Sequence, residues 1–138
     1  MNELLIDSGF LYALFDRTDK HHQAAISVRI SEKGMSVVPD VVLVEAAFLV
    51  RRNGGSSATA SFLETLERWD FRLEAINMAD LKRSRQIMQT YADARLDFVD
   101  CCLMALAERL NIQTICTVDP RDFLIFRPTH CEALETLP

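Results

Sequence analysis

Short apolar runs alternate with longer helical stretches along the chain, and this alternation limits the possible folds more than any other feature. Apolar runs this short have the length of buried strands, whereas the longer stretches carry the spacing of helices. Strands that alternate with helices usually pair in parallel. The pattern therefore predicts an α/β protein with three layers (α/β/α) around a central, mainly parallel sheet. The 138 residues suit one hydrophobic core, so we expect a single domain over residues 1–138.

The expected elements follow in order along the chain. We expect strands at 4–6, 36–38, 71–76 and 114–118, with 71–76 at a sheet edge, and one more strand in the tail. We expect helices at 8–15, 20–33, 39–52, 57–69, 80–91 and 97–110. Asp19 is the expected cap of the second helix, and Asn53-Gly54-Gly55 marks a break between two others.

Composition favours a protein of the cytoplasm that does not enter a membrane. The N-terminus has no basic stretch followed by an apolar run, and no run reaches the roughly 18 apolar residues that cross a bilayer. Four cysteines without C-x-x-C spacing suggest reduced, mostly buried thiols. The net charge of −5 argues against a surface that grips nucleic acid all over, but it allows a cluster of metal-binding carboxylates and a basic partner.

Two acids follow predicted strands directly. Asp7 ends the first strand and Asp119 follows the strand at 114–118. In open parallel sheets, ligand sites gather at this edge. A structural alternative exists for each acid, since Asp7 could cap the next helix and Asp119 could cap a helix that begins at Pro120.

Three further acids lie on predicted helices. Glu45 stands inside a strongly apolar run, where an ionised carboxylate is costly unless it is paired or bound to metal. It could instead face solvent or pair with Arg51 or Arg52. Asp97 and Asp100 are three residues apart at a helix start, which resembles a capping box but also places two carboxylates together. We expect Asp97 to act mainly as the cap and Asp100 as the functional acid.

Asp93 lies at a helix end, where an anion is poorly placed relative to the helix dipole, so it hints at a partner such as Arg95 or at a role near the site. Together the acids form an all-oxygen set of the kind that Mg²⁺ or Mn²⁺ prefers. Phosphate-binding loops, dinucleotide fingerprints and nucleophile elbows are missing from the sequence. His21 and His22 are expected to form a solvated face.

Several segments together resemble a known family, and the resemblance covers nearly the whole chain. The segments are Leu4-Leu5-Ile6-Asp7-Ser8, Val44-Glu45-Ala46-Ala47-Phe48, the run from Tyr91 through Asp100 to Leu110, and Thr117-Val118-Asp119-Pro120-Arg121-Asp122-Phe123. Their order and spacing resemble PIN-domain ribonucleases of the VapC type, the toxins of bacterial toxin–antitoxin pairs. The chain departs from the family pattern at Pro120, where a basic residue is frequent, and at Cys101, where a small residue is usual.

The resemblance implies an endoribonuclease that depends on Mg²⁺ or Mn²⁺. Its acids fall on Asp7, Glu45, Asp100 and Asp119, which would be both metal ligands and catalytic residues. Supporting roles are expected for four residues: Ser8, Asp93, Asp97 and Thr117. RNA-backbone contacts are expected from four cations: Arg17, Lys20, Arg95 and Arg121. The resemblance also implies an antitoxin partner, which would lay a segment into an apolar groove near the site, and a homodimer.

Two other functions stay open at this point. The chain could be a catalytically silent protein-binding module of the same fold. It could also be a metal-dependent phosphohydrolase of small phosphoesters, although that class usually has a D-x-D motif after the first strand and this chain has Asp7-Ser8-Gly9.

Overall fold

A five-stranded parallel sheet forms the centre of the protein. The computed structural model describes residues 2–138. The strands are β1 (Glu3–Ile6), β2 (Met35–Pro39), β3 (Phe71–Glu74), β4 (Thr114–Cys116) and β5 (Glu135–Leu137). They pair in the order β3-β2-β1-β4-β5, and every pair is parallel. The predicted parallel sheet and the edge position of the strand near 71–76 are confirmed.

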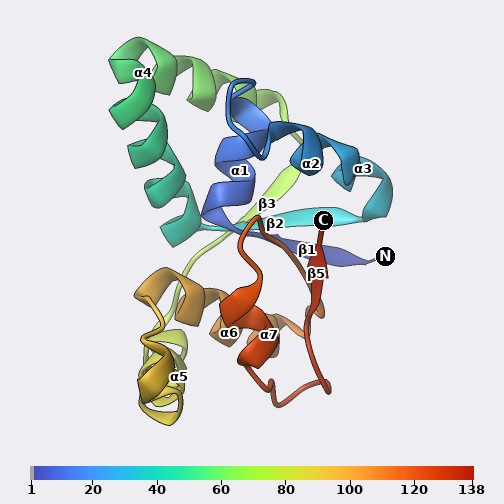
Figure 1. Cartoon of the computed structure of the whole chain (residues 1–138), viewed down its shortest axis with the longest axis vertical. Helices are drawn as coiled ribbons and strands as arrows, with labels where there is room; N and C mark the ends of the chain where they lie inside the picture. The colour runs from blue at the N-terminus through green and yellow to red at the C-terminus, as the bar shows by residue number, and fades with distance from the viewer. Residues whose placement is uncertain (1) are drawn as a thin grey trace.

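Helices cover both faces of the sheet, which confirms the predicted three layers (Figure 1). One side carries α1 (Ser8–Phe15), α2 (His22–Ser27), α3 (Ile30–Lys33) and α4 (Asp40–Arg68). The other side carries α5 (Met78–Thr90), the short 3₁₀ helix η1 (Ala92–Ala94), α6 (Phe98–Leu110) and α7 (Arg121–Ile125). Because each crossover helix returns the chain to the same end of the sheet, all strands point one way.

The core lies where β1 and α6 meet the layers around them. Leu5 and Ile6 on β1 are fully buried, and every residue of α6 from Cys101 to Ala107 is buried. This agrees with the expectation that the helix at 97–110 is packed on more than one side. Its N-terminus is therefore held firmly at one edge of the sheet.

Ion pairs join α5 to α6 on the outer side of that layer. Arg109 donates two hydrogen bonds to Asp80, at 2.9 and 3.0 Å, and Asp80 is almost fully buried. Arg83 binds Glu108 through two further hydrogen bonds. Asp80 also completes a capping box with Asn77, so the helix begins at Met78, two residues before the predicted start.

The predicted helix at 20–33 is wrong in one respect, because two short helices replace it. Arg29 adopts a left-handed backbone with φ of 56°, which ends α2 and separates it from α3. The predicted cap at Asp19 is wrong: Asp19 accepts a hydrogen bond from the backbone N–H of His21, but His21 itself is the N-cap of α2, which has no side-chain cap. The solvated face expected at His21 and His22 is wrong for His22, whose half-buried ring bonds the carbonyl of Ala13 at 2.6 Å.

The predicted break at Asn53-Gly54-Gly55 is confirmed as a kink at Gly55, where the backbone leaves the helical conformation between the two halves of α4. Gly55 has φ of 76° and ψ of −167°, a conformation that residues with a Cβ rarely adopt. The segments on both sides of Gly55 are helical, so α4 changes direction there. The two halves of α4 run in different directions (Figure 1), and the first half starts beside the sheet and leads away from it.

All four cysteines in the described residues are free thiols, and three of them are buried, as predicted. Within residues 2–138, none of the helices combines the length and the apolar character that a membrane crossing requires.

Candidate active site

Asp7 and Thr117 meet at the edge of the sheet where β1 and β4 end. The backbone N–H of Asp7 bonds the carbonyl of Cys116, which continues the pairing of the two strands. The Thr117 hydroxyl then donates to Oδ2 of Asp7 at 2.8 Å. The parallel sheet therefore joins two side chains that are 110 residues apart in the sequence.

Asp7 serves as a helix cap and also belongs to a group of acids. Its Oδ1 accepts the backbone N–H of Ser8 at 2.7 Å, at the start of α1. Burial raises the pKa of Asp7 to about 6, even though the bonds from Thr117 and Ser8 lower it. The charges of Glu45 and Asp97 raise it further. Each carboxylate oxygen has one partner here, and so each keeps a lone pair for another ligand.

Asp100 is held in place by its backbone, whereas its carboxylate is free. Asp97 caps α6 and accepts the Asp100 N–H at 2.8 Å, which confirms the expected cap. Among residues 2–138 the Asp100 carboxylate has no ion-pair partner. Burial raises its pKa to about 8, and the charges of Asp7 and Asp97 contribute next. These shifts indicate that the acids lie near one another without a cation to offset them.

Glu45 joins Asp7 and Asp100 from the first half of α4, and we call these three residues the acid cluster. Its side chain is half-buried, and its charge raises the pKa of both Asp7 and Asp100. The alternative pairing with Arg51 or Arg52 is not found among the ion pairs of residues 2–138. Glu45 is therefore an acid of the site edge and not part of a surface ion pair.

Asp119 lies one hydrogen bond away from this cluster. Its backbone N–H donates to the Thr117 hydroxyl at 3.1 Å, and Thr117 in turn contacts Asp7. Its carboxylate forms two 2.8 Å hydrogen bonds with Arg121, and these bonds lower its pKa. The alternative role of Asp119 as a helix cap is wrong, because α7 begins at Arg121 with Pro120 as its N-cap.

Asp122 is an acid of the site that was not on the predicted list. It lies in the first turn of α7, and its charge raises the pKa of Asp100. The signal in the sequence was its distance of three residues from Asp119, which fits one helical turn. Asp93, in contrast, is exposed in η1 and forms no ion pair with Arg95 among the described residues.

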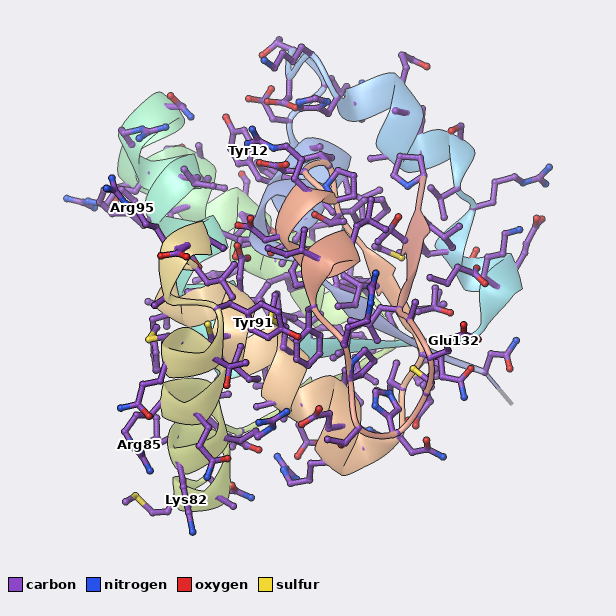
Figure 2. All side chains as sticks on the ribbon, turned by 60° about the horizontal axis from the view of Figure 1, so that its bottom comes forward. Tyr12, Lys82, Arg85, Tyr91, Arg95 and Glu132 are labelled. Carbon is purple, nitrogen blue, oxygen red and sulfur yellow. The ribbon has the colours of Figure 1, made fainter. Side chains whose placement is uncertain are left out.

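The predicted cations lie in different places around the site. Lys20 and Arg17 are exposed in the loop after α1, whereas Arg121 is occupied by Asp119. Arg95 is exposed at the turn that follows η1, on the same side of the molecule as Lys82 and Arg85 of α5 (Figure 2).

The acids suit a hard divalent cation by their chemistry. Asp7, Glu45 and Asp100 offer only oxygen ligands, and each raises the pKa of another acid or has its own pKa raised. Within residues 2–138, no three Asp, Glu, His or Cys side chains already surround a common ion position. The carboxylates would therefore have to rotate inward to bind an ion. The buried Ser8 hydroxyl beside Asp7 has no hydrogen-bond partner, which fits a site where another group is expected.

A parallel α/β fold with acids from four elements at one sheet edge defines a class of protein. The family model of the PIN domain matches residues 4–126, and the chain therefore belongs to the PIN-domain family. Within that family it is of the VapC type, since it is 30% identical over 125 residues to Ribonuclease VapC26 of Mycobacterium tuberculosis. That alignment covers 91% of this chain and 93% of the relative.

Solved structures support the fold. VapC20 of Mycobacterium tuberculosis, described as a Sarcin-Ricin loop cleaving toxin, matches with a TM-score of 0.77 and 20% identity, over 85% of this chain and 90% of that one. VapBC2 from Rickettsia felis, bound to a DNA fragment from its promoter, matches with a TM-score of 0.73 and 11% identity, over 99% of both chains. FitAcB from Neisseria gonorrhoeae matches with a TM-score of 0.70 and 15% identity, over 98% and 96% of the two chains.

Proposed function

We propose that the chain is a divalent-metal-dependent endoribonuclease and the toxin of a type II toxin–antitoxin pair. One observation carries the catalytic part of the proposal. Asp7 and Asp100 share an edge of the sheet, and burial raises the pKa of both, to about 6 and about 8; the charge of Asp7 raises that of Asp100 further. Such a pair costs stability unless a cation binds between the acids. The similarity to Ribonuclease VapC26 supports RNA as the substrate.

Asp7 and Asp100 anchor the principal cation, which is Mg²⁺ or Mn²⁺, and Glu45 completes that site or orients the attacking water. When bound, the cation polarises the phosphodiester and makes water a better nucleophile at neutral pH. Asp119 acts from farther out, through Thr117, or helps to hold a second ion. The unpartnered Ser8 hydroxyl is available to position water or phosphate.

The remaining predicted residues support the site or the substrate. Asp97 holds the first turn of α6 and adds negative charge beside Asp100. Asp93, exposed in η1, is a supporting residue outside the group of Asp7, Glu45 and Asp100. Contacts with the RNA backbone come from four cations: Arg17, Lys20, Arg95 and Arg121.

The test of the nuclease is cleavage of total bacterial RNA by purified protein with Mg²⁺ or Mn²⁺, with and without chelator. We expect Asp100→Asn and Asp7→Asn to lower the rate by at least about a hundredfold, since each removes a charged ligand. Asp70→Asn makes the same chemical change at an exposed position and serves as the matched control. Cleavage by both site variants at the wild-type rate would sink the proposal.

We propose that the antitoxin covers the apolar groove beside Glu45. The groove has a volume of about 570 Å³ and is lined by Val41, Val44, Phe48, Phe98 and Val99, with Asp40 and Glu45 at its edge. Val44 and Phe48 are 71% and 61% exposed, which is unusual for large apolar side chains in a monomer. The acids at the rim and the net charge of −5 favour a segment that carries basic residues beside its apolar ones.

Co-expression with the antitoxin from the same operon tests this surface. Phe48→Ser should lose the co-purified antitoxin, whereas Leu63→Ser, at an exposed apolar position on the far half of α4, should retain it. Retention by Phe48→Ser would place the antitoxin elsewhere. A single-domain homodimer in the cytoplasm completes the proposal, and light scattering on the purified protein measures its mass.

A further inference from the structure

A polar groove lies next to the acid cluster, between α1, the loop after it and the middle of α4. It has a volume of about 640 Å³. Its polar walls come from eight residues: Tyr12, Asp16, Thr18, Asp19, Lys20, His21, Arg52 and Asn53. A second hollow of about 340 Å³ shares Tyr12 and Asn53 with it and extends the path toward Arg17.

The polar groove begins where the acid cluster ends. Gly9 and Val118 line it, and they follow directly after Ser8 and Thr117 in the sequence. His21, which lines the groove, is also near Asp119. The pKa of Asp119 is lowered mainly by Arg121, and the charge of His21 lowers it further. An RNA strand bound at the acid cluster could therefore continue into the polar groove.

The cations of the polar groove are free to bind an anion. Lys20 and Arg52 are exposed, and neither takes part in an ion pair among residues 2–138. The two acids nearby already accept hydrogen bonds from the protein. Asp16 accepts from Tyr12 and from Thr18, and Asp19 accepts from the backbone of His21. These donors are uncharged, so Asp16 and Asp19 stay negative, and Lys20 and Arg52 are the cations that line the groove beside them without an ion-pair partner in residues 2–138.

A hydrogen-bonded chain fixes the walls of the polar groove. The Asn53 amide donates to the Tyr12 hydroxyl at 2.8 Å, and that hydroxyl donates to Asp16 at 2.5 Å. The chain ties α1 to α4 just before the kink at Gly55. Tyr12 lies on the side of the molecule formed by α1 to α4, away from Lys82 and Arg85 (Figure 2). The polar groove is thus preformed, which lowers the entropy cost of binding.

We propose that the polar groove binds the sugar–phosphate backbone of RNA on one side of the bond that is cut. This inference rests on the proposed nuclease function and extends it. Lys20 and Arg52 contact phosphates, and Asn53 offers its second amide hydrogen and its carbonyl oxygen. The Tyr12 ring is only 9% exposed, so it gives no platform for stacking a base. The polar groove therefore holds RNA without reading its sequence.

The test measures binding of a short fluorescent single-stranded RNA of mixed sequence in chelator, over a range of salt concentrations. Full-length Asp100→Asn protein is the background, so that no RNA is cut. Lys20→Gln and Arg52→Gln are added singly and together. Arg29→Gln with Arg68→Gln removes the same charge from exposed ion pairs on helix surfaces and is the matched control. Thermal melting verifies that every variant is folded.

We expect the double variant to raise Kd by about tenfold at low salt. The slope of log K against log salt should fall by about 0.7 for each cation removed, as for single-stranded nucleic acid. Tyr12→Phe should raise Kd and leave the slope unchanged, since it removes only a hydroxyl. In the cleaving protein, Lys20→Gln with Arg52→Gln should raise KM and leave kcat within about twofold.

Equal slopes for the groove variants and the control would overturn the inference, even if the protein cleaves RNA. Groove-dependent RNA binding without any cleavage by the wild type would support the inference and reject the nuclease. Loss of a co-purified antitoxin, with RNA binding unchanged, would assign the polar groove to a protein partner and overturn the inference.

Discussion

The acid cluster should destabilise the protein when no cation is bound, and Asp100→Asn tests this. Burial and neighbouring acids raise the pKa of Asp100 from 3.8 to about 8. The folded protein therefore keeps a proton on Asp100 that the unfolded chain has released. Folding takes up a proton between these pH values, so the free energy of unfolding falls as pH rises through this window and levels off above it. Asp7 adds the same trend between 3.8 and about 6.

The loss of stability follows from the size of the pKa shift of Asp100. At roughly 1.4 kcal/mol per pKa unit, the full shift would correspond to roughly 6 kcal/mol. Solvent screens the part of Asp100 that is exposed, and the neutral side chain loses a favourable interaction with the N-terminus of α6. We therefore expect Asp100→Asn to stabilise the metal-free protein by roughly 2 kcal/mol above pH 8, which raises Tm by roughly 6 °C. Near pH 4 the two proteins should melt together.

Thermal melting in chelator between pH 4 and pH 9 measures this difference. Asp70→Asn, on the exposed loop before β3, should follow the wild type at every pH. Added Mg²⁺ should raise the Tm of the wild type and leave that of Asp100→Asn unchanged, since a ligand stabilises only the state that binds it. A variant that is no more stable than the wild type above pH 8 would refute the reasoning.

Three more predictions concern the fold. Asp80→Ala should lower the free energy of unfolding by about 3 kcal/mol, because it leaves Arg109 without its buried partner and removes half of a capping box. Urea denaturation measures this, and a loss below about 1 kcal/mol would contradict it. Gly55→Ala should lower the free energy of unfolding by about 1–2 kcal/mol through backbone strain alone, since a Cβ there meets no atom within 4 Å. An unchanged Tm would argue against the kink. Arg121→Ala should change the free energy of unfolding by less than about 0.5 kcal/mol, because Arg121 and Asp119 are 84% and 58% exposed, and a larger loss would give the pair a role in the fold.

The local elements were largely predictable from the sequence. The helix at 8–15, the cap at Asp97 and the parallel sheet agree with the structure, because each depends on neighbouring residues or on a repeated apolar pattern. The errors are also local in origin. Arg29 enters a left-handed conformation that side-chain type rarely signals, so α2 and α3 replace the single helix expected at 20–33.

The surroundings of the individual acids were beyond the reach of the sequence. Asp119 is held by Arg121, Asp122 joins the acids from α7, and Asp93 stays outside as an exposed residue. The link from Thr117 to Asp7 likewise depends on β1 and β4 being neighbours.

The sequence by itself determined which residues form strands and helices and which acids end them, since periodicity, caps and turns act over a few residues. The tertiary structure alone decided which of those acids repel one another and which are paired. It also decided that Lys20 and Arg52 face one groove, because the order of strands and the kink of α4 set the distances between segments far apart in the chain.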